Sequence, residues 1–280
     1  MAYGTLNRGT DRGIYGHGVG NGEEEPLLGT SKANDRAARL ARYMKDDLDK
    51  KWADLILLMS YIITGLLDSS AVFIWGSFVS MQTGNTVYLG LGLVAPSEST
   101  RWIRSGISIG SFCMGSFFIS RFHRYFSPKR RWVLLASFSF QLILISASAI
   151  IVMIDPETGG DLRWEVLVPL ALVAFQSSGQ AVTSRALQYN ALTSVVLTSI
   201  YCDLFSDPLI MAGLTQNVER NRRAAAPVLL LVGAMFGGVW AHSSIGLAGA
   251  LWTAAALKIV IILSWCFWRG EPHVGEETDD

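Results

Sequence analysis

The hydrophobic residues of this chain gather into long runs that are separated by short polar segments. From residue 53 onward there are eight such runs, at about 53–75, 78–94, 103–121, 132–153, 164–184, 192–213, 225–242 and 246–268. Most of them approach the ~20 residues that an α-helix needs to cross ~30 Å of hydrocarbon. Tryptophans lie at or near the run ends, where an amphipathic ring sits at the level of the lipid headgroups. The pattern predicts an all-α fold, a polytopic transmembrane helical bundle.

Two of the eight runs are interrupted by polar residues. The interruptions are Thr83-Gly84-Asn85 in the run 78–94 and Asp203, Asp207 and Pro208 in the run 192–213. Broken helices are tolerated in hydrocarbon only where they are buried in protein or line a cavity. Gly84 permits unusual backbone dihedrals, and Thr83 or Asn85 can cap the helix that follows. The freed N–H groups either face a solute, preferably an anion or a carbonyl, or are satisfied internally.

The basic residues between the runs predict how the chain crosses the membrane. The first 51 residues carry nine Lys and Arg and the segment 121–131 carries five, so the positive-inside rule places both on the cytoplasmic side. Three runs separate these segments, which requires that one run does not cross. The arginines that precede the run 225–242 give the same result for the second half. We predict six spans plus two re-entrant or broken half-helices, with eight full spans as the alternative.

The two halves of the membrane region resemble each other weakly. Gly65 and Gly179 are separated by nearly the same number of residues as Thr83 and Thr198. Three crossings per half would invert one half relative to the other, which is the architecture of many transporters and channels. We therefore predict an inverted repeat.

Polar segments flank the membrane region. Residues 1–35 are rich in Gly, Asn and Thr and are predicted to be disordered and cytoplasmic, because they cannot bury enough surface to order themselves. Residues 36–51 predict a juxtamembrane amphipathic helix, capped by Asn34 or Asp35. The remaining chain divides into a transmembrane domain at 52–268, with halves at about 53–153 and 164–268, and an acidic tail at 269–280.

The N-terminal segment contains one candidate sorting signal. Glu23, Leu27 and Leu28 fit an acidic-dileucine pattern, although short motifs of this kind also match by chance. Such a signal is consistent with a plasma membrane or an endolysosomal or vacuolar membrane.

Composition excludes several classes of protein. Half of the 280 residues are hydrophobic, 16% are charged and the formal net charge is zero. A soluble domain of this size carries more charge, at about 25% of its residues, and nucleic-acid binding needs a basic patch that is missing here. The common motifs of metalloproteases, serine hydrolases and P-loop enzymes are also missing, as is a paired-cysteine metal site. We expect neither an enzyme nor a bound cofactor or metal.

Two stretches carry a family resemblance. The stretch 64–68 (TGLLD) and the stretch 81–86 (MQTGNT) resemble the signature of the YoaK-like membrane proteins, a family known as a domain of unknown function (1275). The family's second motif is matched, with Thr198-Ser199 in place of the usual Thr-Gly, by Gly179-Gln180, Arg185 and Leu197-Thr198-Ser199. The resemblance covers about residues 53–268. It implies a polytopic membrane protein, usually described with six spans, and no substrate.

Ionisable residues inside the predicted membrane spans are the main functional candidates, since they are costly there unless they pair or serve a purpose. Asp68 lies past the middle of the first run, Asp203 in the sixth and Lys258 near the centre of the last. Lys258 could form a static pair with Asp68 or Asp203, the carboxylates could couple to protons or ions, or the side chains could snorkel. Gln141 and Gln180 are uncharged residues that suit either a helix contact or a solute.

These residues define a functional hypothesis. The candidate solute path comprises Asp68, Thr83, Gly84, Asn85, Gln180, Thr198, Asp203 and Lys258. Glycines suited to close helix packing, which we favour within the chain over contact between subunits, are Gly106, Gly110, Gly115, Gly233, Gly237 and Gly238. We expect a small-solute transporter or channel whose partners are the lipid bilayer and an unknown small solute or ion. The alternatives are a membrane scaffold or assembly protein, oligomeric through the glycine faces, and a lipid-modifying membrane enzyme.

Overall fold

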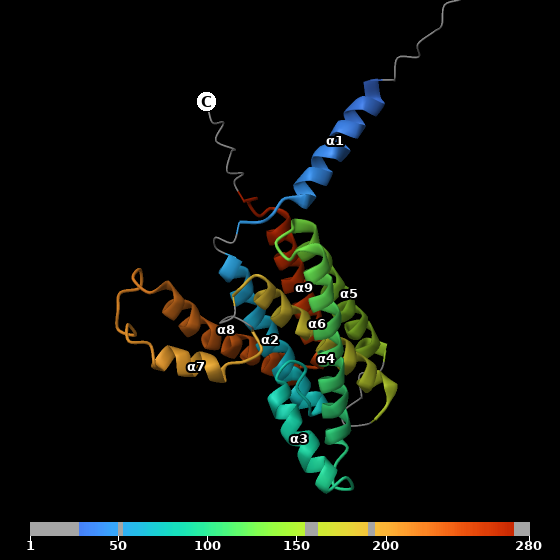
Figure 1. The fold of residues 1–280 in the computed structure, drawn as a ribbon. Coiled ribbons are helices and arrows are strands. Elements are labelled where there is room, and N and C mark those ends of the chain that lie inside the picture. The colour runs from blue at the N-terminus through green and yellow to red at the C-terminus, as the bar shows by residue number, and fades with distance from the viewer. Residues whose placement is uncertain (1–27, 50–52, 155–161, 190–193, 272–280) are drawn as a thin grey trace, which may run out of the picture. The chain divides into compact units, whose positions relative to one another are not determined.

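The computed structural model describes residues 28–49, 53–154, 162–189 and 194–271, and all regular elements in these residues are helices. Figure 1 shows their arrangement. The helices are α1 (Leu28–Lys45), α2 (Ala53–Trp75), α3 (Gln82–Val94), α4 (Arg101–Phe126), α5 (Arg131–Ile154), α6 (Trp164–Ala186), α7 (Thr198–Phe205), α8 (Val218–Ala241) and α9 (Gly246–Cys266). The predicted all-α fold is confirmed.

The chain separates into two parts, residues 1–41 and residues 42–280. Of the first part the structure describes only the helical residues from Leu28 onward, so Glu23 and Leu27 of the candidate sorting signal lie outside the described residues. The helix begins before Asn34 and Asp35, which therefore do not cap it. Alanine, leucine and basic residues dominate the segment and favour continuous helix through these two polar positions.

Helix α1 ends at Lys45, before the predicted end at residue 51, because the next residues hydrogen-bond to two other segments. The segment 46–49 lies between residues 129–131 and residues 269–271: Leu48 N donates to the carbonyl of Lys129 at 3.0 Å, and Asp49 N donates to that of Arg269 at 3.1 Å. Leu48 is buried. The start of the membrane region, the α4–α5 loop and the end of α9 are therefore joined at one end of the bundle.

Five helices, α2, α5, α6, α8 and α9, are long and apolar enough to cross a membrane, which supports a membrane-embedded protein. Helix α4 has 26 residues and includes four arginines. Helices α3 and α7 have 13 and 8 residues. At ~1.5 Å per residue they reach ~20 Å and ~12 Å, which is too short for the ~30 Å hydrocarbon core.

Glycines bring α2 and α8 into close contact. A methyl group added to Gly65 would lie 2.0 Å from the carbonyl oxygen of Leu230, and one added to Gly233 would lie 2.1 Å from that of Ile62. Gly237 similarly faces the backbone of Leu66. Only glycine allows the two backbones to approach this closely.

The second close crossing joins α4 to α6. A methyl group on Gly115 would lie 2.5 Å from the carbonyl oxygen of Phe175. The predicted packing role inside the chain is thus correct for Gly115, Gly233 and Gly237. It is wrong for Gly110 and Gly238, which face open space, and Gly106 meets only the tip of Leu89 at 3.7 Å. The repeating spacing of small residues identified the helices but not the face that packs.

Helices α5 and α9 pack together beside these two crossings. Their apolar side chains join those of α2 and α6 in one core. Among its buried members are Leu66, Trp75, Phe138, Leu170, Leu251 and Trp265.

Helix α7 and the first turns of α8 project at one edge of the bundle (Figure 1). The loop between them is held by Arg220, which donates hydrogen bonds to backbone carbonyls in the range 210–213. Asp207 accepts from the backbone N–H of Leu209 at 2.8 Å and from Asn217 at 3.0 Å. These two hydrogen bonds hold the pKa of the Asp207 carboxyl below its ordinary value. The loop is therefore ordered by its own polar groups.

Candidate functional site

Asp68 fastens the turn between α2 and α3. Its Oδ1 accepts hydrogen bonds from the backbone N–H groups of Val79 at 2.8 Å and Ser80 at 2.9 Å, and its Oδ2 accepts from the Ser80 hydroxyl. The side chain is 2% exposed. A pair between Asp68 and Lys258, one of the alternatives considered from the sequence, does not form, because the carboxylate is used by backbone donors 11 and 12 residues further along the chain.

Asn85 ties α3 to the same turn. Its Oδ1 accepts from Ser77 Oγ at 2.9 Å and Phe78 N at 3.0 Å, while its Nδ2 donates to the Phe78 carbonyl at 2.7 Å and to Ser108 Oγ on α4 at 3.1 Å. The side chain is fully buried. The amide oxygen and nitrogen of Asn85 therefore both form hydrogen bonds inside the protein. This agrees with the alternative in which the polar groups of this segment are satisfied internally and do not face a solute.

Thr83-Gly84-Asn85 does not interrupt a helix. It lies in the first turn of α3, whose N-cap residue is Met81 and which has no side-chain cap hydrogen bond. Thr83 is exposed, and the space beside Gly84 is taken by the Phe78 ring. The predicted capping by Thr83 or Asn85 is wrong because Asn85 points back to the preceding turn instead.

The second predicted half-helix places its polar residues outside the core. Thr198 begins α7 and Asp203 lies within it, and both are exposed. Ile200 is the buried residue of this helix. The alternative pair between Asp203 and Lys258 is therefore not formed either, since Lys258 is fully buried on α9.

Lys258 instead bonds to Gln141 across the α5–α9 contact. Its Nζ donates to Gln141 Oε1 at 2.5 Å and lies 5.0 Å from the centroid of the Phe138 ring. Both Lys258 and Gln141 are 0% exposed. No carboxylate of the described residues lies within ion-pair distance of Nζ. The one lysine buried at the centre of the described bundle thus has a neutral amide as its partner.

A chain of polar groups continues from this pair through the bundle. Gln141 Nε2 donates to Ser137 Oγ at 3.4 Å, which lies 3.3 Å from His123 Nε2 on α4. The same His123 nitrogen lies 3.4 Å from Thr183 Oγ1 on α6. His123 is 2% exposed. Buried polar groups of α9, α5, α4 and α6 are in this way joined at hydrogen-bond distance.

Gln180 belongs to a separate contact. Its Nε2 donates to Thr64 Oγ1 at 3.2 Å and links α6 to α2. Both residues are buried at about 2% exposure. Of the two functions foreseen for this glutamine, the structure shows the helix contact.

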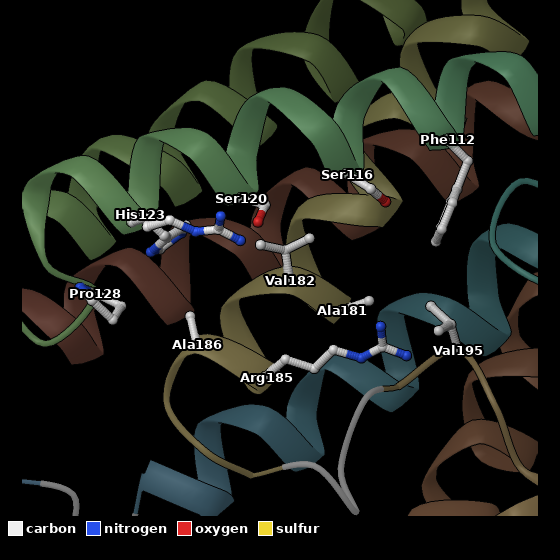
Figure 2. Close-up of a pocket in the computed structure, with 11 residues that line it drawn as sticks. Phe112, Ser116, Ser120, His123, Pro128, Ala181, Val182, Arg185, Ala186 and Val195 are labelled. Atoms are coloured by element: carbon white, nitrogen blue, oxygen red, sulfur yellow. The ribbon is translucent and has the colours of Figure 1, made fainter.

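A basic cavity of about 600 Å³ lies between the second halves of α4 and α6. Figure 2 shows Ser116 and Ser120 of α4 opposite Ala181 and Val182 of α6. The lining residues are Phe112, Ser116, Ser120, His123, Arg124, Pro128, Ala181, Val182, Arg185, Ala186 and Val195. His123 is also a member of the buried polar chain, so this chain ends at the cavity wall.

Two further hollows are smaller. One, of about 450 Å³, is apolar and lies beside Phe118, Phe140 and Phe175. The other, of about 270 Å³, lies at the end of α3 beside Tyr88 and Arg101. Thr83, Gly84 and Asn85 line none of these three cavities. Within the described ranges no three His, Cys, Asp or Glu side chains are grouped as a metal site requires.

Most of the chain matches the model of a known protein family. The family model described as "Protein of unknown function (DUF1275)" matches residues 56–264. The chain belongs to the DUF1275 family. The match covers the bundle from α2 to α9, so Lys258, Gln141 and the basic cavity of this DUF1275 protein all lie within the family domain. No curated protein and no solved structure matches the chain significantly.

The cavity was missed at the sequence level although the sequence contains a signal for it. Ser116, Ser120 and Arg124 recur every four residues and therefore lie on one face of α4. Neither His123 nor Arg124 is among the candidates from the sequence, and Arg185 enters there only as part of the family's second motif. The polar stripe on α4 is visible in the sequence, but its meeting with α6 depends on the helix crossing at Gly115.

Proposed function

We propose that this DUF1275 protein transports a small solute, with the basic cavity as one mouth of its path and the buried polar chain as the inner part. The observation that carries the proposal is Lys258, which is fully buried and bonded to the neutral amide of Gln141. An ionisable side chain held inside a membrane protein is costly, and such residues commonly mark substrate or proton pathways. The polar groups between Lys258 and His123 give this residue a connection to the cavity.

The order and packing of the helices support an inverted repeat. Each half reads long, short, long, long: α2–α5 and then α6–α9. Helix α2 of the first half packs on α8, and α4 packs reciprocally on α6. A two-fold axis that relates the halves would convert the α2–α8 pair into the α6–α4 pair. The α5–α9 pair would then lie on the axis. Lys258 and Gln141 would then sit where the halves meet, as substrate sites of repeat transporters do.

The same repeat supports a six-plus-two topology. In this arrangement α2, α4, α5, α6, α8 and α9 cross, and the short helices α3 and α7 do not. The N-terminus and the α4–α5 loop are then cytoplasmic, which agrees with the positive-inside rule. The basic cavity, which Pro128 of this loop lines, opens to the cytoplasm. The membrane concerned is the plasma membrane or an endolysosomal or vacuolar one.

The proposed path differs from the one expected from the sequence. Lys258 is retained, whereas Asp68, Asn85 and Gln180 are bonded within the helix framework and Thr198 and Asp203 are exposed. The residues that take their place are His123, Arg124 and Arg185 at the cavity.

The proposal is tested by uptake into liposomes that contain the purified full-length protein, over a panel of ions and metabolites. Lys258→Met should abolish the uptake of the transported solute. Lys129→Met is the matched control, because Lys129 lies in the α4–α5 loop and pairs with Glu271 at the surface. Uptake no greater than in protein-free liposomes for the whole panel, or equal loss in both variants, would contradict the proposal.

A second candidate function is assembly with another membrane helix. Gly110 faces open space among the described residues and Gly106, one turn earlier on α4, meets only the tip of Leu89, and small residues at this spacing suit close contact between helices. This face favours a scaffold or an oligomer. Gly110→Leu would block such contact. If this variant has the same oligomeric state as the wild type in bilayer nanodiscs, the protein does not assemble through this face of α4.

A further inference from the structure

We infer that the basic cavity between α4 and α6 binds a phosphate-type oxyanion, clamped by the guanidinium groups of Arg124 and Arg185. The inference rests on the proposed function, because it names the chemical class of the solute that would occupy the cavity. It applies equally to a phosphate carried by a free solute and to one carried by a lipid headgroup, since both present the same oxygen atoms.

The charge of the cavity is uncompensated. Arg124 comes from α4 and Arg185 from α6, and no Asp or Glu is among the lining residues. Two arginines of α8 are paired, in contrast: Arg222 lies 2.7 Å from Asp54, and Arg223 lies 3.2 Å from Glu219. In the described residues the side chains of Arg124 and Arg185 have no such partner, so two positive charges face one space.

Neutral hydrogen-bond donors surround the same space. Ser116 and Ser120 project from α4 toward α6, and Arg185 extends along the opposite wall (Figure 2). The ring of His123 also contributes to the wall, although it is almost entirely buried at 2% exposure. Two guanidinium forks with nearby hydroxyl donors match the acceptor oxygens of a phosphate group.

The size of the cavity limits the ligand. A volume of about 600 Å³ lies in the range of small-molecule sites. Phe112, Val182 and Val195 form apolar parts of the wall, which suit the organic portion of a phosphorylated solute or the glycerol and upper acyl region of a lipid.

The test measures binding to the full-length protein in micelles of a phosphate-free maltoside detergent. Inorganic phosphate is titrated at constant ionic strength with chloride as the balancing anion, and phosphatidic acid is offered in a second set of mixed micelles. Arg124→Gln and Arg185→Gln should each weaken binding by about tenfold, because each removes charge-assisted hydrogen bonds. Arg121→Gln is the control: Arg121 is exposed on the same helix, lies over the Phe117 ring and does not line the cavity.

The outcomes separate the two sources of phosphate. Binding of inorganic phosphate that depends on Arg124 and Arg185 supports a free solute, and binding of phosphatidic acid alone with the same dependence supports a lipid headgroup. No binding of either, or an equal effect of Arg121→Gln, overturns the inference. Oxyanion binding without uptake of any solute would uphold the inference and refute the proposed transport function. Uptake of a cation or a neutral solute without oxyanion binding would uphold transport and refute the inference.

Discussion

The pair formed by Lys258 and Gln141 predicts an unusual order of mutant stabilities. Replacing Gln141 by methionine keeps an unbranched side chain but leaves the buried Nζ of Lys258 without its acceptor. A buried polar group that loses its partner costs about 1–3 kcal/mol, and more when the group is charged. Gln141→Met should therefore lower the free energy of unfolding by at least this amount.

Lys258→Met should cost less than Gln141→Met. It strands Gln141 Oε1, but it also removes the cost of holding an amino group inside the protein. The double variant removes both partners and should approach the wild-type stability, because replacing both members of a buried polar pair by apolar groups of similar shape is nearly neutral. The two substitutions should thus show a coupling energy of at least about 1 kcal/mol.

Unfolding in mixed micelles of increasing denaturing-detergent content, followed by tryptophan fluorescence, measures these differences. Asp68→Asn in the Lys258→Met background is the control, and it should give no rescue because Asp68 bonds to the α2–α3 turn. Purely additive single effects, or a double variant less stable than both single ones, would refute the assignment. Rescue by Asp68→Asn would instead identify Asp68 as the partner of Lys258, in the ion pair that was one alternative from the sequence.

Three further predictions concern the framework. Gly237→Ala should lower thermal stability strongly, since its methyl group would lie 2.4 Å from a backbone oxygen of α2, whereas the adjacent Gly238→Ala faces open space and should leave the melting temperature unchanged or slightly raised. Asp68→Asn should retain most of the stability because one amide oxygen can still accept from both backbone N–H groups, while Asp68→Leu should cost about 1–3 kcal/mol for each stranded donor, as chemical or thermal unfolding would show. A cysteine at Ser127, in a variant without the native cysteines, should be labelled by an impermeant thiol reagent only after cells are opened; labelling of intact cells would contradict the six-plus-two topology.

The helical framework could be predicted from the sequence because a helix that crosses a membrane needs a continuous run of hydrophobic residues. The expected boundaries of the runs 53–75, 132–153 and 246–268 differ little from those of α2, α5 and α9. The short helices could also be expected, since Thr83-Gly84-Asn85 and Asp203 mark places where a full span is unfavourable. Such a run depends only on residues that are neighbours in the sequence, so it can be recognised without knowing which helices pack together.

The partners of the buried polar residues could not be predicted in the same way. Asp68 and Lys258 have opposite charge, but which side chains meet depends on the direction in which each helix face points. A tight turn at Gly76, which has a φ of 70°, returns two backbone N–H groups to Asp68. The opposite charges of Asp68 and Lys258 do not predict this turn. The pairing of Lys258 with Gln141 likewise follows from the α5–α9 contact and not from the charge of either residue.

The two halves of the bundle use their short helices differently, and this bears on where a transport movement would occur. Helix α3 is held by Asn85, whose amide bonds to the preceding turn and to α4, and by the Asp68-bound turn before it. Helix α7 has one buried residue, the apolar Ile200, and no comparable polar attachment among its described side chains. Elements with few buried contacts open at a lower free energy than those fixed by buried hydrogen bonds. The segment that leads into α7 contributes Val195 to the basic cavity. Displacement of α7 would therefore change the mouth of the cavity while the Asp68–Asn85 framework stays fixed, which assigns the moving part of the proposed path to the second half of the chain.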